Sequence, residues 1–236
     1  MTRPRAAAER FVRSLHLDPA RCDVLYSPLI ETATTGALPD LSKVGALIFT
    51  SGAGVASYQA LGGLPDFECY TVGATTARAA EAAGFSPISA EGDADALVAL
   101  LCGETPPSPL LHIRGTYSRG AVAARLSAAG IPCQEAILYD QPSQAASPEA
   151  LRRLAAKHTV IAPLFSPRTA SLFADLPMHH GSVHAIAMSQ PILDEVAHLP
   201  LAAHVMSDAP TGAHMRDTVL LHLKQATVLE AKKTDR

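Results

Sequence analysis

The sequence lacks an excess of charge of either sign. Its 236 residues include 19 Lys or Arg and 22 Asp or Glu, which gives a formal net charge of −3. A chain so close to neutrality creates no bulk field that would attract nucleic acid or an anionic membrane surface. Any anionic ligand must therefore be held by local groups.

Long hydrophobic runs and paired cysteines are also missing. No apolar run approaches the ~18 residues that a membrane-spanning helix needs. An amphipathic pattern over residues 6–17 follows the first five residues directly, without the apolar core of a signal peptide. The four cysteines lie far apart and form no CxxC motif, which is typical of buried thiols in a reducing compartment. We therefore expect a cytoplasmic protein.

The familiar catalytic motifs are absent too. The sequence contains no GxSxG elbow, no HExxH helix and no phosphate loop with GK[ST]. Its candidate carboxylates, Asp93, Asp95 and Asp140, lie in predicted caps or turns, where a structural role is sufficient. With 48% hydrophobic and 17% charged residues, the chain can nevertheless bury substantial cores.

What is present is a strand, turn and helix pattern that occurs four times. Residues 48–55 and 70–78 each join an apolar run to an alanine-rich helical pattern through Ser, Thr or Gly. The pattern returns at residues 159–170 and 183–192. One such turn occurs in any doubly wound protein, but Ser51 and Thr76 are separated by nearly the same distance in sequence as Ser166 and Gln190. The matched spacing predicts two similar α/β halves, each built on a doubly wound parallel sheet.

The rest of the chain alternates in the same way. Strands are predicted at residues 22–30, 46–50, 86–89, 110–114, 133–139, 160–165, 183–187 and 203–205. Helices are predicted at residues 6–17, 94–102, 120–129 and 211–227, with another beginning at Pro148 and a frayed tail from Glu230. The pattern breaks near residues 32–37 and 140–142, where we expect domain boundaries.

Candidate ligand-binding residues gather at the predicted strand ends. There a parallel sheet exposes backbone amides and the positive end of the next helix. The residues in these positions are Ser51, Gly52, Thr75, Thr76, Gly115, Ser166 and Ser189, with Arg114, Arg119 and Arg168 beside them and Tyr139 at the second break. This set suits a large polycarboxylate ligand that is held by backbone amides and hydroxyls.

Short motifs along nearly the whole chain match one known family in their order and spacing. They are Thr2-Arg3-Pro4, Ile48-Phe49-Thr50-Ser51, residues 72–77 with Gly84, Gly92-Asp93 with Leu97, residues 130–139, Phe165-Ser166-Pro167 and Ala185-Ile186. Together they resemble uroporphyrinogen-III synthase, the haem-pathway enzyme that closes the linear tetrapyrrole hydroxymethylbilane while inverting its last pyrrole ring.

The resemblance implies a domain organisation. It implies two α/β domains, residues 1–32 with 142–236 and residues 33–141, joined by linker strands near residues 29–34 and 137–141. The first of these domains is discontinuous in sequence. It also implies a monomer that acts on a small molecule, with no metal and no organic cofactor.

The resemblance further implies a lyase reaction. Loss of hydroxide from hydroxymethylbilane would give an azafulvene, and a spiro intermediate would form before correct closure. It implies a catalytic role for Tyr139 and a substrate contact for Thr76. Three departures weaken the match. The family's first strand before Thr-Arg-Pro is almost absent, Gly52-Ala53 replaces an arginine or asparagine of the family, and residues 187–190 replace its Gly-x-Thr-Thr turn.

Two alternatives remain open at this point. A two-domain cytoplasmic binding protein could close on an anionic small molecule without turning it over, because the same strand ends would serve it equally well. Tyr139 could likewise be a packing residue of the linker.

Overall fold

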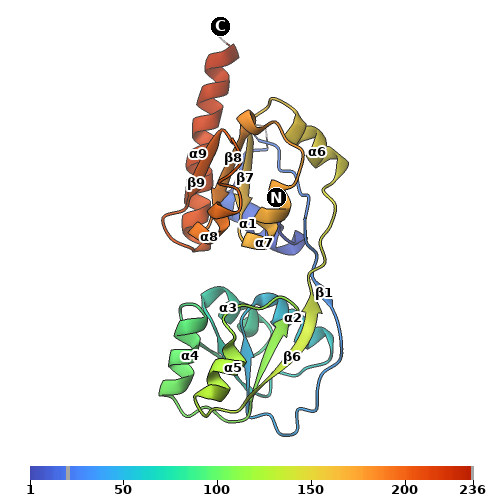
Figure 1. Cartoon of the computed structure of the whole chain (residues 1–236), viewed down its shortest axis with the longest axis vertical. Helices are drawn as coiled ribbons and strands as arrows, with labels where there is room; N and C mark the ends of the chain where they lie inside the picture. Colours follow the sequence, from blue (N-terminus) through green and yellow to red (C-terminus); the bar gives the residue numbers. More distant parts are fainter. Residues whose placement is uncertain (20–21, 235–236) are drawn as a thin grey trace. The chain divides into compact units, whose positions relative to one another are not determined.

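A computed structural model describes residues 1–19 and 22–234 (Figure 1). The chain forms two compact units, one from residues 1–31 with 143–236 and the other from residues 32–142. The second unit is therefore inserted between two parts of the first. In the following, unit 1 is the discontinuous one and unit 2 is residues 32–142.

Unit 2 is built on a six-stranded sheet. Its strands are β1 (Ala33–Thr34), β2 (Ala46–Phe49), β3 (Glu68–Thr71), β4 (Pro87–Ser89), β5 (Leu110–Gly115) and β6 (Cys133–Asp140). They lie in the order β1-β6-β5-β2-β3-β4. All neighbours are parallel except β1, which runs antiparallel to β6 and pairs Thr34 with Tyr139.

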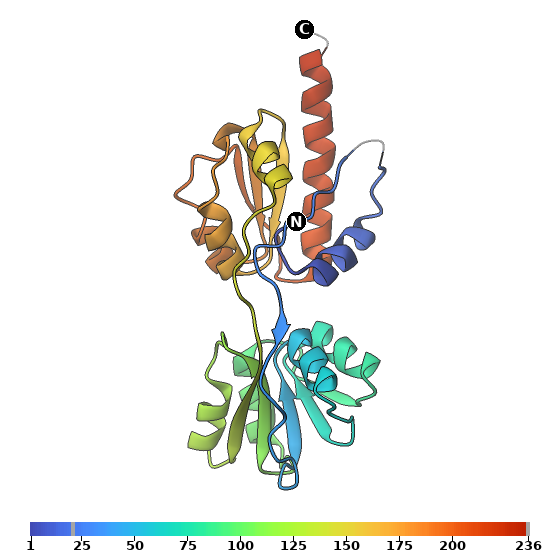
Figure 2. The same cartoon turned by 90° about the vertical axis from the view of Figure 1, so that its right-hand side faces the viewer.

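Helices cover both faces of this sheet (Figure 2). They are α2 (Gly52–Ala60), α3 (Ala74–Ala82), α4 (Ala94–Gly103) and α5 (Val122–Ala128). Side chains alternate along a strand, so Leu47 and Phe49 pack with residues of α2 and α3, whereas Ala46 and Ile48 pack with residues of α4 and α5. The prediction of a doubly wound parallel sheet is confirmed.

Unit 1 repeats this arrangement on a smaller, fully parallel sheet. Its strands β7 (Val160–Leu164), β8 (Val183–Ala187) and β9 (Ala203–Met206) lie in that order. On one face the core includes side chains of α6 (Pro148–Ala155), α7 (Pro167–Ala174) and α8 (Gln190–Asp194). On the other face it includes side chains of α1 (Arg5–Leu15) and α9 (Gly212–Thr234), and a 3₁₀ turn, η1 (His180–Ser182), precedes β8.

Two sequence predictions about secondary structure are wrong. Residues 22–30 form no strand, because their backbone pairing is confined to isolated contacts. Ser27 N donates to Met1 O at 3.0 Å and Leu29 N to Thr2 O at 2.8 Å, and Ile30 forms a single bridge with Ser143. The last helix continues to Thr234, beyond the predicted end at residue 227 and through most of the predicted frayed tail. Ala, Glu and Lys in this stretch are strong helix formers. Residues 235 and 236 lie outside the described residues.

Two glycines of unit 2 offer a matched test of its packing. A Cβ on Gly45, just before β2, would lie 2.4 Å from the backbone carbon of Pro107, whereas one on Gly103 meets nothing within 4 Å. We expect Gly45→Ala to lower the free energy of unfolding by about 1–3 kcal/mol through overpacking. Gly103→Ala should raise it by about 0.5 kcal/mol, because alanine restricts the unfolded chain. Urea denaturation of both variants measures the difference, and equal midpoints would contradict the close approach at Gly45.

Candidate functional site

The carboxyl edge of the sheet in unit 2 brings together six of the predicted site residues. Parallel strands end at the same edge, and β6, β5, β2 and β3 are consecutive neighbours. The residues at these strand ends are Ser51 and Gly52 after β2, Thr75 and Thr76 after β3, Gly115 at the end of β5 and Tyr139 near the end of β6. We call this set the strand-end site.

A hydrogen bond joins the two hydroxyls at the centre of the strand-end site. Ser51 Oγ lies 2.8 Å from the Tyr139 hydroxyl, although the two residues are far apart in sequence. The Tyr139 side chain is only 6% exposed and packs against Gly115, where a Cβ would lie 2.4 Å from the ring. Gly115 is therefore needed because the tyrosine ring approaches its backbone so closely.

Helix α2 begins at this pair. Ser51 is its N-cap, and Ser51 Oγ accepts a hydrogen bond from Gly54 N at 3.2 Å. The N–H groups of Gly52 and Ala53 lie in the first turn, where an α-helix provides no acceptor of its own. These two amides, together with the positive end of the helix, can bind an anionic group.

Helix α3 begins beside it in a different way. Its N-cap is Gly73, which offers no side-chain cap, so the N–H groups of Ala74 and Thr75 are left for a ligand. The Thr76 side chain is buried, and Thr76 N donates to Gly73 O at 3.0 Å. The sequence analysis treated Thr75 and Thr76 alike, but only the Thr75 amide is unused within the helix.

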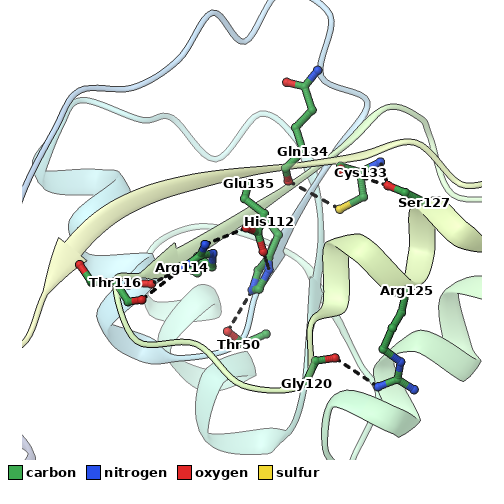
Figure 3. Close-up of polar contacts among 11 residues, drawn as sticks. Thr50, His112, Arg114, Thr116, Gly120, Arg125, Ser127, Cys133, Gln134 and Glu135 are labelled. Carbon is green, nitrogen blue, oxygen red and sulfur yellow. Dashed lines mark hydrogen bonds and ion pairs between the residues drawn. The ribbon is translucent and has the colours of Figure 1, made fainter.

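A polar network of Thr50, His112, Arg114 and Glu135 lies next in sequence and sheet register to the strand-end site, and its contacts are drawn in Figure 3. His112 Nε2 lies 3.1 Å from Thr50 Oγ1, and His112 Nδ1 lies 3.7 Å from Glu135 Oε1. Glu135 Oε2 also accepts from Arg114 Nη2 at 2.8 Å, and Arg114 Nη1 donates to Gly115 O at 2.9 Å. Arg114 thus connects Glu135 to the carbonyl of Gly115, which the Tyr139 ring packs against, while His112 contacts the residue before Ser51.

The environment of His112 defines its charge and tautomer. His112 is fully buried, and this burial lowers its pKa to about 4, although the Glu135 carboxylate opposes the shift. The imidazole is therefore neutral near pH 7. A carboxylate beside Nδ1 favours the proton on that nitrogen, which leaves Nε2 to accept a hydrogen bond from the Thr50 hydroxyl.

The sequence analysis missed His112 and Glu135. The signals were a histidine inside the apolar run of residues 110–113 and a glutamate in the next strand, but only the strand register places them opposite each other. It also treated Arg114 as a possible anion-binding group. The structure instead pairs its guanidinium with Glu135.

The remaining predicted residues lie on other segments of the chain. Arg119 lies in the exposed loop between β5 and α5. In unit 1, Ser166 is the N-cap of α7, where its Oγ accepts from Thr169 N at 3.2 Å, and Arg168 lies in the first turn. Ser189 is the N-cap of α8 without a side-chain cap bond. The structure places these three at the carboxyl ends of β7 and β8.

Neither a metal cluster nor a long apolar helix occurs in the described part of the chain. Among the side chains that the structure describes, no group of three or more from His, Cys, Asp and Glu is arranged to hold a metal ion. In the same part of the chain, no helix combines the length and the apolar character that crossing a membrane requires.

Comparison with known proteins identifies the family. A family model described as uroporphyrinogen-III synthase HemD matches residues 17–217. The chain belongs to the uroporphyrinogen-III synthase family. No curated protein sequence matches the chain significantly.

Solved structures of the family share the fold. Uroporphyrinogen-III synthetase from Helicobacter pylori has a TM-score of 0.65 at 18% identity, covering 81% of this chain and 90% of that one. A mutant uroporphyrinogen III synthase from Thermus thermophilus has a TM-score of 0.53 at 18% identity, covering 96% and 98%. The two-domain α/β fold expected from the resemblance is confirmed.

Family membership also establishes the function. The chain is an enzyme of haem biosynthesis that closes hydroxymethylbilane to uroporphyrinogen III with inversion of the last pyrrole ring. The alternative of a binding protein without catalysis is not favoured.

The neutral, buried His112 predicts an acid-sensitive stability. Its pKa of about 4 lies below the ordinary 6.5. Below pH 6.5, His112 of the unfolded chain therefore binds a proton, whereas His112 of the folded chain stays neutral until the pH approaches 4. We expect this residue to lower the free energy of unfolding by about 3 kcal/mol as the pH falls from 6.5 to 4. The variant His112→Gln, which cannot titrate, should lack this component. Parallel stability curves for the two proteins between pH 7 and 4 would contradict the assignment.

Proposed function

We propose that the strand-end site of unit 2 carries out the cyclisation, as a lyase reaction in which Tyr139 assists the loss of water. The observation that supports this most directly is the 2.8 Å hydrogen bond between Ser51 Oγ and the Tyr139 hydroxyl, beside the N-terminus of α2. This hydrogen bond places a proton donor, the Tyr139 hydroxyl, next to the first-turn amides of α2, which can bind the carboxylates of a substrate.

The proposal assigns one direction to this hydrogen bond. Ser51 Oγ accepts from Gly54 N at 3.2 Å and, in the proposal, donates its own proton to the Tyr139 oxygen. The Tyr139 proton is then free to donate to the hydroxyl of the substrate. Ser51 acts by orienting the phenol.

The proposed chemistry begins when the carbon–oxygen bond of the hydroxymethyl group breaks. The departing hydroxide takes the proton offered by Tyr139 and leaves as water, and the pyrrole nitrogen stabilises the azafulvene. The substituted carbon of the last pyrrole then attacks to form the spiro intermediate, which fragments and closes in the inverted order. The phenolate regains a proton from the ring that rearomatises, so that the enzyme is restored. The protein mainly folds the substrate and shields the cation.

The other predicted residues are assigned to binding the carboxylates of the substrate. We assign acetate or propionate groups to the first-turn amides at Gly52 and Thr75, and Gly115 leaves room for the Tyr139 ring. The Thr76 side chain is buried and supports the turn. Further substrate contacts are proposed for Arg119, Ser166, Arg168 and Ser189.

The domain assignment and cellular state are also proposals. We propose that units 1 and 2 are the two domains of the family, joined by the segments at residues 29–34 and 137–141. We further propose a monomer, because the exposed large apolar side chains among the described residues lie on separate elements. The free cysteines Cys22, Cys69, Cys102 and Cys133 fit a reducing cytoplasm.

The role of Tyr139 is tested by Tyr139→Phe. Hydroxymethylbilane closes without help to the type I isomer, so a weaker enzyme should let that isomer accumulate. We expect the rate of type III formation to fall about 100-fold, which is typical for loss of a general acid. Folding should be nearly unchanged, because the substitution keeps the packing volume. Chromatographic separation of the two isomers measures the effect, and an unaltered rate would make Tyr139 a packing residue.

The role of the backbone amides is tested at Gly52, the first residue of α2. Proline is tolerated at this position of a helix and already occupies it in α6 and α7. Gly52→Pro removes one N–H group, and we expect it to raise the KM for hydroxymethylbilane about tenfold. The control Gly52→Ala keeps the N–H group and should behave like the wild type. Equal KM values for the proline and alanine variants would argue against amide binding.

A further inference from the structure

Arg3 is packed at the carboxyl end of β7 in unit 1. Its guanidinium carbon lies 4.1 Å from the centroid of the Phe165 ring. The Phe165 ring in turn meets the Phe11 ring edge to face, with centroids 4.8 Å apart. Phe165 follows the last residue of β7 and precedes Ser166, the N-cap of α7. The charge of Arg3 is thus held beside the start of a helix.

No described residue neutralises this charge. Arg3 Nε is buried without a hydrogen-bond partner, and no ion pair from Arg3 to a described residue is found. Arg10 adds a repulsive positive charge, and burial together with Arg10 lowers the pKa of Arg3 to about 10. A partly desolvated cation without an acidic partner destabilises a fold.

Arg5 shows what a structural arginine looks like in the same region. Its guanidinium also stacks on a ring, 4.0 Å from the centroid of Tyr26. It differs because its Nε pairs with Glu9 at 2.6 Å and because its side chain is 59% exposed. Both arginines stack on a ring, so stacking does not explain why Arg3, unlike Arg5, has no acidic side chain among the described residues as an ion-pair partner.

Apart from Arg168 in the first turn of α7, the helices at this edge offer few other groups for an anion. Helix α7 begins with Pro167, and α8 has Pro191 in its first turn, so each has one N–H group fewer than α2 or α3. The Oγ of Ser166 is already engaged by Thr169. A negatively charged group here would depend on a cationic side chain.

We propose that Arg3 binds a carboxylate of the tetrapyrrole substrate at the carboxyl end of β7. This rests on the proposed function, in which the chain folds a polycarboxylate. Stacking on Phe165 fixes the plane of the guanidinium and leaves the donors along its edge for a carboxylate, which can accept two parallel hydrogen bonds. Arg3 would then be a substrate-binding residue whose missing acidic partner is supplied by the ligand.

The test compares Arg3→Met with Arg5→Met in the full chain. Methionine keeps much of the apolar contact with the ring and removes the charge. For Arg3→Met we expect the KM for hydroxymethylbilane to rise about 10- to 100-fold, as for loss of a charge-assisted hydrogen bond. The melting temperature should stay the same or rise, because an unpaired cation is removed. Arg5→Met should change neither KM nor isomer ratio, and Arg3→Lys should give an intermediate KM.

A binding measurement separates failure of this inference from failure of the proposed function. The octacarboxylate uroporphyrin III serves as the probe, with its affinity followed by fluorescence. Weaker binding to Arg3→Met than to Arg5→Met supports the carboxylate site even if turnover is slow. A lower melting temperature with unchanged KM and probe affinity would overturn it, since Arg3 would then be a packing residue. Absence of the type III isomer with wild-type protein would refute the proposed function instead.

Discussion

The parallel pairing of β2 with both β3 and β5 is the constraint on which the strand-end site depends. Because the three strands run in one direction, the loops that follow them meet at one edge of the sheet. The helices that begin there, α2 and α3, present their positive ends at that edge. An antiparallel neighbour at either position would move one loop to the opposite edge and separate these groups.

The polar network of Thr50, His112, Arg114 and Glu135 has a different role. Loops at the end of a sheet have few apolar contacts, so their geometry needs other restraints. Two side chains provide them: His112, through its contact with Thr50, and Arg114, which connects Glu135 to the Gly115 carbonyl. Ser51 follows Thr50 and Tyr139 packs on Gly115, so each half of the hydroxyl pair has one of these restraints beside it.

Much of the fold was predictable because apolar runs and helix starts are local signals. The strands at residues 110–114, 133–139 and 183–187 came from such runs, and Ser51 was recognisable as a cap. The Ser51–Tyr139 bond and the His112–Glu135 contact were not predictable, since each depends on the register between strands far apart in sequence. The strand predicted at residues 22–30 is absent because a local apolar run is not sufficient. A strand also needs a neighbouring segment that pairs with it along its length, and residues 22–30 have none in the described part of the chain.

Two partly buried arginines, Arg114 in unit 2 and Arg3 in unit 1, differ in how their charge is compensated. Arg114 in unit 2 forms an ion pair with Glu135, so its positive charge is compensated within the protein. Arg3 in unit 1 is stacked on Phe165 near Arg10 and is not neutralised by a described residue. The fold tolerates this unfavourable arrangement, which is expected where a charge is positioned for a ligand. In the proposed binding mode, unit 2 would bind carboxylates mainly through backbone amides, whereas unit 1, whose helix starts contain proline, would bind a carboxylate through a side chain.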